Sequence, residues 1–148
     1  MGVLYSCIPI TDTPEIQTWL HEHSATLPSQ TMFARNPTPQ DIRTTLGTLE
    51  NYTVDYGVRS TFWHADIFYA PDPEHGPCTS IIVLNYQDDE SRPYDIYFEK
   101  GWPELILTIM EQLSRLCGPL LCVPDTGNTP IVVVPGLKPS EAIHAWYE

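Results

Sequence analysis

The sequence predicts an α+β fold: a mainly antiparallel β-sheet, made of an N-terminal strand, a four-strand meander and a C-terminal hairpin, with helices packed on one face. Two observations predict this class. Apolar residues recur at every second position through the middle of the chain, and at intervals of three and four residues in segments before and after it. The connections between the alternating segments are short and rich in Pro, Asp and Gly, whereas parallel strands need crossovers of a dozen or more residues.

The strands follow from the alternation and from a high content of aromatic and β-branched residues. In the first strand of the meander, Tyr52, Val54, Tyr56 and Val58 alternate with polar or small residues, which is typical of a strand with one buried face. Turn-forming residues separate this segment from the next ones. We expect strands at residues 2–9, 52–59, 61–70, 79–86, 94–100, 120–123 and 131–134.

The helices are indicated by proline at a first helical position, where its fixed φ suits the helix and its missing N–H is not needed. Thr13 and Thr38 precede two of these prolines and are suited to cap the helix N-terminus. The third helix has apolar residues over a broad arc, which predicts a place at the centre of the core. The helices are expected from Pro14 to a stop at Pro28, from Pro39 to Gly47, from Pro103 to Cys117 and over a short segment after Pro139, with a loop at residues 29–37.

Length and composition predict a single globular domain over residues 1–148, since 42% of the residues are hydrophobic. Seven basic and 19 acidic residues give a net charge of −12. This balance disfavours direct binding of nucleic acid, because Lys and Arg normally supply the phosphate contacts. The first residues lack the pattern of a secretory signal, and no apolar run has the length of a membrane span. We therefore expect a cytoplasmic protein whose four cysteines are reduced.

One short motif has a catalytic interpretation. Asp125, Thr126 and Gly127 follow an apolar run and resemble the catalytic turn of aspartic proteases. That chemistry needs two such turns, so that a pair of carboxylates shares one proton, and this chain has one copy. Asp, Gly and Asn are also the commonest turn formers, and the preferred interpretation is a hairpin turn.

A second cluster of polar residues suggests a metal site. His64 and Asp66 are two residues apart on a predicted strand and share a face, and His75 on the following loop could fold back beside them. Nitrogen and oxygen ligands of this kind suit zinc or another divalent ion, and a metal-assisted hydrolase is one hypothesis. The spacing matches no established metal signature, and a hydrogen bond between His64 and its neighbours on a polar sheet face is the preferred interpretation.

The charge pattern favours a binding protein without catalytic activity. Asp88, Asp89 and Glu90 crowd one predicted connection, and Asp95 follows on the next strand among aromatic residues such as Trp63 and Tyr97. Acids interleaved with aromatics recognise Lys and Arg through charge-assisted pairing and stacking. We expect a protein that engages and blocks a basic protein partner and needs no cofactor, and a bacterial immunity or inhibitor protein is one version of this class. The acids would steer the encounter, and Trp63 or Tyr97 would act as anchors. A structural or assembly subunit is a further alternative, and the sequence leaves the oligomeric state open.

Overall fold

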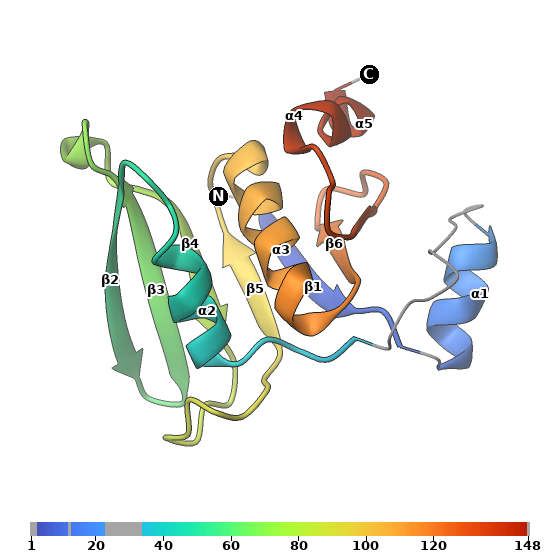
Figure 1. The fold of residues 1–148 in the computed structure, drawn as a ribbon, viewed down its shortest axis with the longest axis horizontal. Coiled ribbons are helices and arrows are strands. Elements are labelled where there is room, and N and C mark those ends of the chain that lie inside the picture. The colour runs from blue at the N-terminus through green and yellow to red at the C-terminus, as the bar shows by residue number, and fades with distance from the viewer. Residues whose placement is uncertain (1–2, 12, 23–33, 148) are drawn as a thin grey trace.

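The computed structural model describes residues 3–11, 13–22 and 34–147 and confirms the predicted α+β class. One seven-stranded sheet has the strand order β2-β3-β4-β5-β1-β6-β7, and every neighbouring pair is antiparallel (Figure 1). The strands are β1 Leu4–Pro9, β2 Tyr52–Arg59, β3 Phe62–Tyr69, β4 Pro77–Val83, β5 Ile96–Glu99, β6 Leu120–Pro124 and β7 Ile131–Val133. The helices are α1 Pro14–Glu22, α2 Pro39–Leu46, α3 Pro103–Cys117, α4 Pro139–Ala142 and α5 His144–Tyr147, with a single 3-10 turn at Pro73–His75.

The meander and the C-terminal hairpin form as predicted, and the N-terminal strand joins them. β1 lies between β5 and β6, so it pairs with the last strand of the meander on one side and with the hairpin on the other. This position of β1 joins the meander and the hairpin, so all the strands of the described residues belong to one sheet.

Several strand boundaries differ from the prediction, and for two of them the backbone geometry gives the reason. The third meander strand ends at Val83 rather than at residue 86, because the chain turns at Asn85, where φ is 55°. The fourth begins at Ile96 rather than at Tyr94, because the Tyr94 N–H donates to the Pro37 carbonyl and not to a neighbouring strand. The predicted helix stop at Pro28 and the loop residues before Ala34 lie outside the described residues.

The start of α2 shows the capping predicted for Thr38. The Thr38 hydroxyl accepts from the Asp41 N–H at 3.0 Å, and the Asp41 carboxylate accepts from the Thr38 N–H at 3.0 Å, which completes a capping box. Arg35 also pairs with Asp41, at 2.7 Å. These bonds fix the entry to α2, whose Ile42 and Leu46 are buried in the core.

The main core lies between the sheet and helices α2 and α3. Trp63, Ala65 and Ile67 on β3 point into it, as do Ile106, Ile109 and Leu113 on α3. The predicted central position of α3 is confirmed, since its buried residues extend from Leu105 to Cys117. Ala142, Ile143 and Trp146 of the C-terminal segment pack against the same core.

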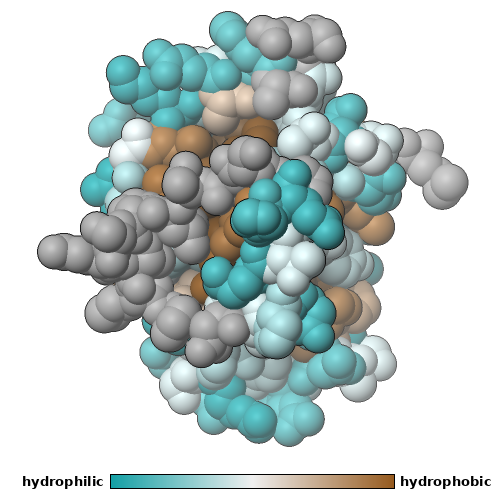
Figure 2. Space-filling model, turned by 90° about the vertical axis from the view of Figure 1, so that its right-hand side faces the viewer, coloured by the Kyte–Doolittle hydropathy of each residue, from teal (hydrophilic) through white to brown (hydrophobic). Residues whose placement is uncertain are grey.

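A smaller cluster lies on the other side of the sheet, at its β6–β7 end. Leu20 of α1 packs there with Ile10 and Leu121, and Val123 and Val132 border the contact. Figure 2 views this end of the molecule and shows hydrophobic residues between the hydrophilic ones. Helix α1 therefore covers only one end of the second face, and none of the helices in the described residues covers the part over β2 to β5, as Figure 1 shows. Among the helices in the described ranges, none has the length and apolarity needed to cross a membrane.

Candidate functional site on the open face of the sheet

The side of the sheet turned away from α2 and α3 presents a row of polar side chains over β2 to β5, and we call this side the open face. Asp55 is paired with Asp66, Asp66 with Ser80, and Ser80 with Glu99 in the strand register. Strand side chains alternate between faces, and the core-facing neighbours Ala65, Ile67 and Ile81 show that this row points away from the helices. Three carboxylates are thus aligned across four strands.

The first two carboxylates of this row lie directly opposite each other, and like charges in that position destabilise a sheet. Asp55 is exposed and Asp66 is partly buried. Asp66 has two local partners: the Ser80 hydroxyl donates to its Oδ1 at 2.7 Å, and His64 Nδ1 lies 3.5 Å from its Oδ2. These contacts orient the Asp66 carboxylate on the face where Asp55 is its strand partner.

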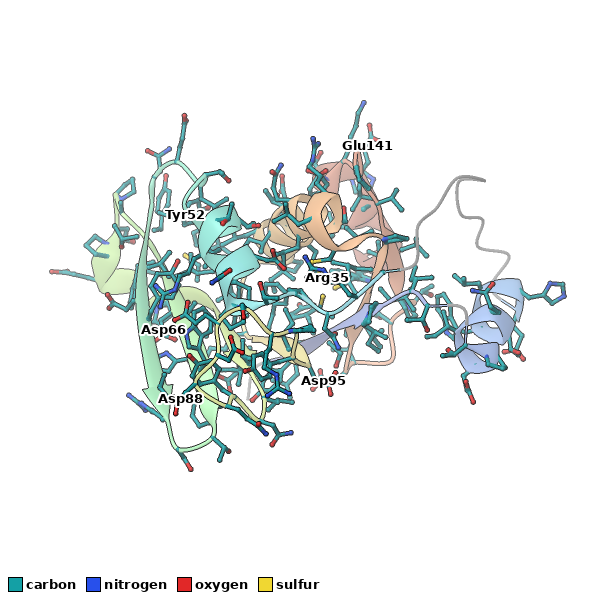
Figure 3. The ribbon with its side chains drawn as sticks, turned by 60° about the horizontal axis from the view of Figure 1, so that its bottom comes forward. Arg35, Tyr52, Asp66, Asp88, Asp95 and Glu141 are labelled. Atoms are coloured by element: carbon teal, nitrogen blue, oxygen red, sulfur yellow. The ribbon has the colours of Figure 1, made fainter. Side chains whose placement is uncertain are left out.

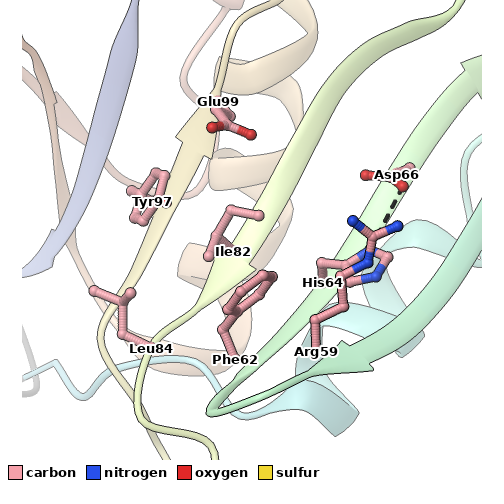
Figure 4. A pocket seen from close by; sticks show the side chains of 8 residues that line it. All are labelled: Arg59, Phe62, His64, Asp66, Ile82, Leu84, Tyr97 and Glu99. Carbon is pink, nitrogen blue, oxygen red and sulfur yellow. Dashed lines mark ion pairs between the residues drawn. The ribbon is translucent and has the colours of Figure 1, made fainter.

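A shallow pocket of about 250 Å³ opens beside this row (Figure 4). Its apolar walls come from Phe62 on β3, Ile82 on β4 and Tyr97 on β5, with Leu84 at one end, and its polar lining consists of Arg59, His64, Asp66 and Glu99. Burial raises the pKa of the Tyr97 phenol, and the charge of Glu99 adds to this. The site combines apolar and aromatic surface with a carboxylate on each side.

The exposed apolar surface continues from the pocket onto β1. Leu84 is 39% exposed, and Leu4 and Ile8, which point to the same side as Ser6 on β1, are 37% and 36% exposed. Contiguous exposed apolar residues rimmed by polar ones are typical of interaction surfaces. The open face therefore combines exposed apolar residues with a row of carboxylates.

A glycine on β2 makes room for the histidine of this site. Gly57 is the strand partner of His64, and a Cβ atom at Gly57 would lie 2.6 Å from His64 Nε2. The imidazole therefore lies over the glycine, which has no side chain to displace it. This isolated glycine in an alternating strand was the signal in the sequence that could have located the site.

The acidic connection predicted to bind a partner is largely engaged within the protein. Glu90 accepts two hydrogen bonds from Arg43, at 2.6 and 3.0 Å, and this contact lowers the pKa of Glu90. Asp89 accepts from the N–H and the hydroxyl of Ser91. Asp88 is exposed and has a φ of 56°. Asp88 is thus the member of the trio whose carboxylate has no role in these contacts.

The other predicted binding residues lie in three different environments. Trp63 is 1% exposed, beneath Tyr56 and the Arg43 guanidinium, so the prediction of Trp63 as a surface anchor is not compatible with its position in the core. Asp95 accepts a hydrogen bond from the Asn36 amide at 3.1 Å. Tyr97 is partly buried and lines the pocket of the open face.

The hypothetical metal site is not assembled. His64 and Asp66 do lie together on the open face, but the ring of His75 packs on Trp102, 5.9 Å away between centroids, beyond the other end of β3. Within the part of the chain that the structure describes, no three His, Cys, Asp or Glu side chains are close enough to hold a metal ion. The preferred interpretation of His64, a polar contact on a sheet face, matches its position.

The Asp125 motif lies in a turn, and the four cysteines are buried. Asp125 and Gly127 lie in the connection of the β6–β7 hairpin, with Asp125 exposed, as the hairpin interpretation predicted. All four cysteines are buried and unpaired with one another. Burial raises the pKa of both Cys117 and Cys122 to about 12, so these thiols are protonated near neutral pH.

The acidic residues do not gather into the single patch that the sequence suggested. Figure 3 shows Asp66, Asp88, Asp95 and Glu141 at separate places around the molecule. Asp41, Glu90 and Glu111 are paired with Arg35, Arg43 and Arg115, which removes three of the carboxylates from the free surface. Asp55, Asp66 and Glu99 take part in none of these three ion pairs, and they lie in one row on the open face, where Arg59 lines the adjoining pocket.

The sequence reasoning did not include Phe62, Ile82 and Leu84 among the site residues, because an apolar side chain on a strand does not by itself show which face it lies on. No family model, curated protein or solved structure matches this chain.

Proposed function

We propose that this protein is a non-catalytic binding protein that engages a basic protein partner through the open face. The observation that supports this most directly is the row Asp55, Asp66 and Glu99 beside an aromatic pocket. An approaching cation is attracted to all three carboxylates and relieves the repulsion between the opposed pair.

The size of the pocket favours a single side chain over a free small molecule. Its volume of about 250 Å³ is below the range of roughly 300–1,000 Å³ that is typical of small-molecule sites. A Lys or Arg side chain of a partner can lay its aliphatic stem on Phe62 and Tyr97 and direct its charged end to Asp66 or Glu99. The apolar surface of Leu4, Ile8 and Leu84 then becomes buried around this contact.

The net charge of −12 supports the same class of partner at longer range. A negative protein accelerates its encounter with a positive one, and the effect falls with ionic strength. An inhibitor of the immunity type is the specific version that we propose: it would cover the positive site of an enzyme that acts on a polyanion. The hydrolase alternative is dropped, since His75 lies apart from His64 and Asp66.

The experiment is a capture of partners from a lysate of the source cells with the immobilised protein, followed by association kinetics with the captured protein. The variants are Glu99→Lys and Tyr97→Ala on the open face. Glu141→Lys on α4 is the control, because it makes the same charge change at a distant exposed position. We expect a basic partner whose association slows with salt, and about tenfold weaker binding for each open-face variant but not for the control.

Three results would overturn the proposal: a partner that is acidic, equal binding by the open-face variants and the control, or an open face buried in a stable homo-oligomer. The last result would favour the structural-subunit alternative. Sedimentation of the purified protein shows whether such a homo-oligomer forms, and sedimentation of the Leu4→Glu variant shows whether the oligomer depends on the open face.

A further inference from the structure

A second pocket lies on the helix-bearing side of the sheet, where β2 approaches the start of α3. It has a volume of about 460 Å³ and is lined by Leu49, Tyr52, Trp102, Glu104, Leu105 and Thr108; we call it the Trp102 pocket. Unlike the pocket of the open face, it falls within the size range of small-molecule sites, roughly 300–1,000 Å³.

Aromatic rings form one wall of the Trp102 pocket. Tyr52 and Trp102 line it, and Tyr69 lies behind them, with its ring 5.6 Å from that of Tyr52 and 5.8 Å from that of Trp102. Trp102 is 38% exposed although it is large and apolar. The series continues past Trp102 to His75, whose ring lies 5.9 Å from that of Trp102 between centroids. A packed series of rings that includes an exposed tryptophan offers π faces to a ligand.

The backbone holds Trp102 in this position. Lys100 and Gly101 both have positive φ, of 57° and 107°, and a Cβ atom at Gly101 would overlap the carbonyl oxygen of Cys78. The Thr79 hydroxyl lies 3.2 Å from the carbonyl oxygens of both Glu99 and Lys100. The turn that presents Trp102 is therefore fixed by close packing on β4, so the aromatic wall is formed before any ligand arrives.

The charge in the Trp102 pocket comes from one carboxylate. Glu104 is exposed in the first turn of α3, and its charge is among the causes, after burial, that raise the pKa of Tyr52. Thr108 uses its hydroxyl to donate to the Glu104 carbonyl at 2.8 Å. The lining side chains thus offer one anion and few further hydrogen-bond acceptors, so a cation without N–H donors leaves no unpaired donor in this pocket.

The protein itself contains an occupied arrangement of this type. The Arg43 guanidinium lies 4.2 Å from the ring centroid of Tyr56 and 5.5 Å from that of Trp63, and it pairs with Glu90. Aromatic faces with one carboxylate therefore already hold a cation on the same side of the sheet. In the Trp102 pocket, no cation of the described residues takes the corresponding place among the lining side chains.

We propose that the Trp102 pocket binds a small organic cation of the quaternary ammonium class, with its alkylated nitrogen against Trp102 and Tyr52 and its charge balanced by Glu104. A quaternary nitrogen has no N–H to satisfy, and aromatic faces attract it through their negative quadrupole. This inference is independent of the proposed function, because the pocket lies on the opposite side of the sheet from the open face.

The test is a titration of the protein with choline, followed by the backbone and indole N–H signals in two-dimensional NMR spectra. The neutral carbon isostere of choline, in which a tert-butyl group replaces the trimethylammonium group, is the matched ligand control. We expect saturable shifts at the indole of Trp102 and the amide of Thr108, and about tenfold weaker binding of the isostere.

Three variants complete the experiment. We expect Glu104→Gln to weaken choline binding about fivefold, and Trp102→Leu to abolish the saturable shifts. Leu116→Ala is the matched control, because Leu116 is exposed on the same helix at its other end, and it should bind like the parent protein. Glu104 is exposed, so its variant decides the question even if Trp102→Leu does not fold. Equal binding of choline and the isostere, unchanged binding by Glu104→Gln, or shifts confined to other residues would each overturn the proposal.

Discussion

Replacing Asp55 by lysine should stabilise the protein, although it changes a residue of the proposed binding surface. Asp55 and Asp66 are direct strand partners on the open face. Opposite charges in such a position stabilise a sheet and like charges destabilise it, each by roughly 0.2–1 kcal/mol. Asp55→Lys removes a repulsion and adds an attraction. Because Ser80 and His64 already contact Asp66, we take values in the middle of the range and expect a gain of about 1 kcal/mol in the free energy of unfolding.

Urea denaturation at neutral pH measures this gain, and thermal unfolding should show a rise in Tm of about 3 °C for a domain of this size. Two variants serve as controls. Asp55→Asn removes the repulsion without adding the attraction and should give about half the gain. Glu50→Lys at an exposed turn changes the net charge by the same amount and measures the general effect of lowering the charge of −12.

Salt gives a further check on the mechanism. The gain from Asp55→Lys should shrink as NaCl is added, since both groups are accessible to solvent. If Asp55→Lys and Glu50→Lys stabilise equally, the opposed pair has no special energetic role. That result would refute the reasoning by which a cationic partner relieves repulsion on this face.

Two further predictions concern the core side. Glu90→Gln should lower the free energy of unfolding by about 1 kcal/mol at neutral pH, because it breaks the bidentate contact that holds Arg43 over Tyr56. The folded state lowers the pKa of Glu90, so the contribution of Glu90 to the free energy of unfolding is complete above the ordinary Glu pKa of about 4.3 and is lost as the pH falls through the lowered pKa. Urea denaturation of both proteins at a series of pH values checks this. A loss of stability in Glu90→Gln that does not depend on pH would contradict it. At about pH 8 the four cysteines should react with a thiol reagent far more slowly in the folded protein than in urea, because burial keeps the thiols protonated and inaccessible. One thiol that reacts rapidly in the folded protein would show that the burial is incomplete.

The structure also shows which charge-reversal experiment would mislead. The sequence alone would favour a test of the acidic connection in which Asp88, Asp89 and Glu90 are reversed together. Glu90→Lys would place a second cation beside Arg43 and disturb its contacts with Tyr56 and Trp63. Asp88→Lys is the member of this set that probes the surface without breaking a contact described above.

Most of the elements could be predicted because their signals are local. The alternation from Tyr52 to Val58, the Thr38 cap with Pro39 and the broad apolar arc after Pro103 each depend on residues within a few positions of one another. The candidate site was less accessible to this reasoning. His64, Asp66 and Tyr97 were among the predicted residues. The sequence reasoning grouped His64 and Asp66 with His75 because these residues are close along the chain, and it grouped Tyr97 with Trp63 because both are aromatic residues in an acidic sequence.

The sequence by itself determined the α+β class, the meander, the hairpin and the helix starts, because alternation, capping and turn chemistry act over short stretches of chain. Only the tertiary structure decided that β1 lies between β5 and β6, that α2 and α3 cover the face bearing Trp63, and that the face bearing Asp66 stays open. The alternation of apolar and polar residues separates the two faces of a strand, but it does not determine which face a helix covers. That choice depends on contacts between residues far apart in the chain, and it places Trp63 in the core and Asp55, Asp66 and Glu99 side by side on the surface.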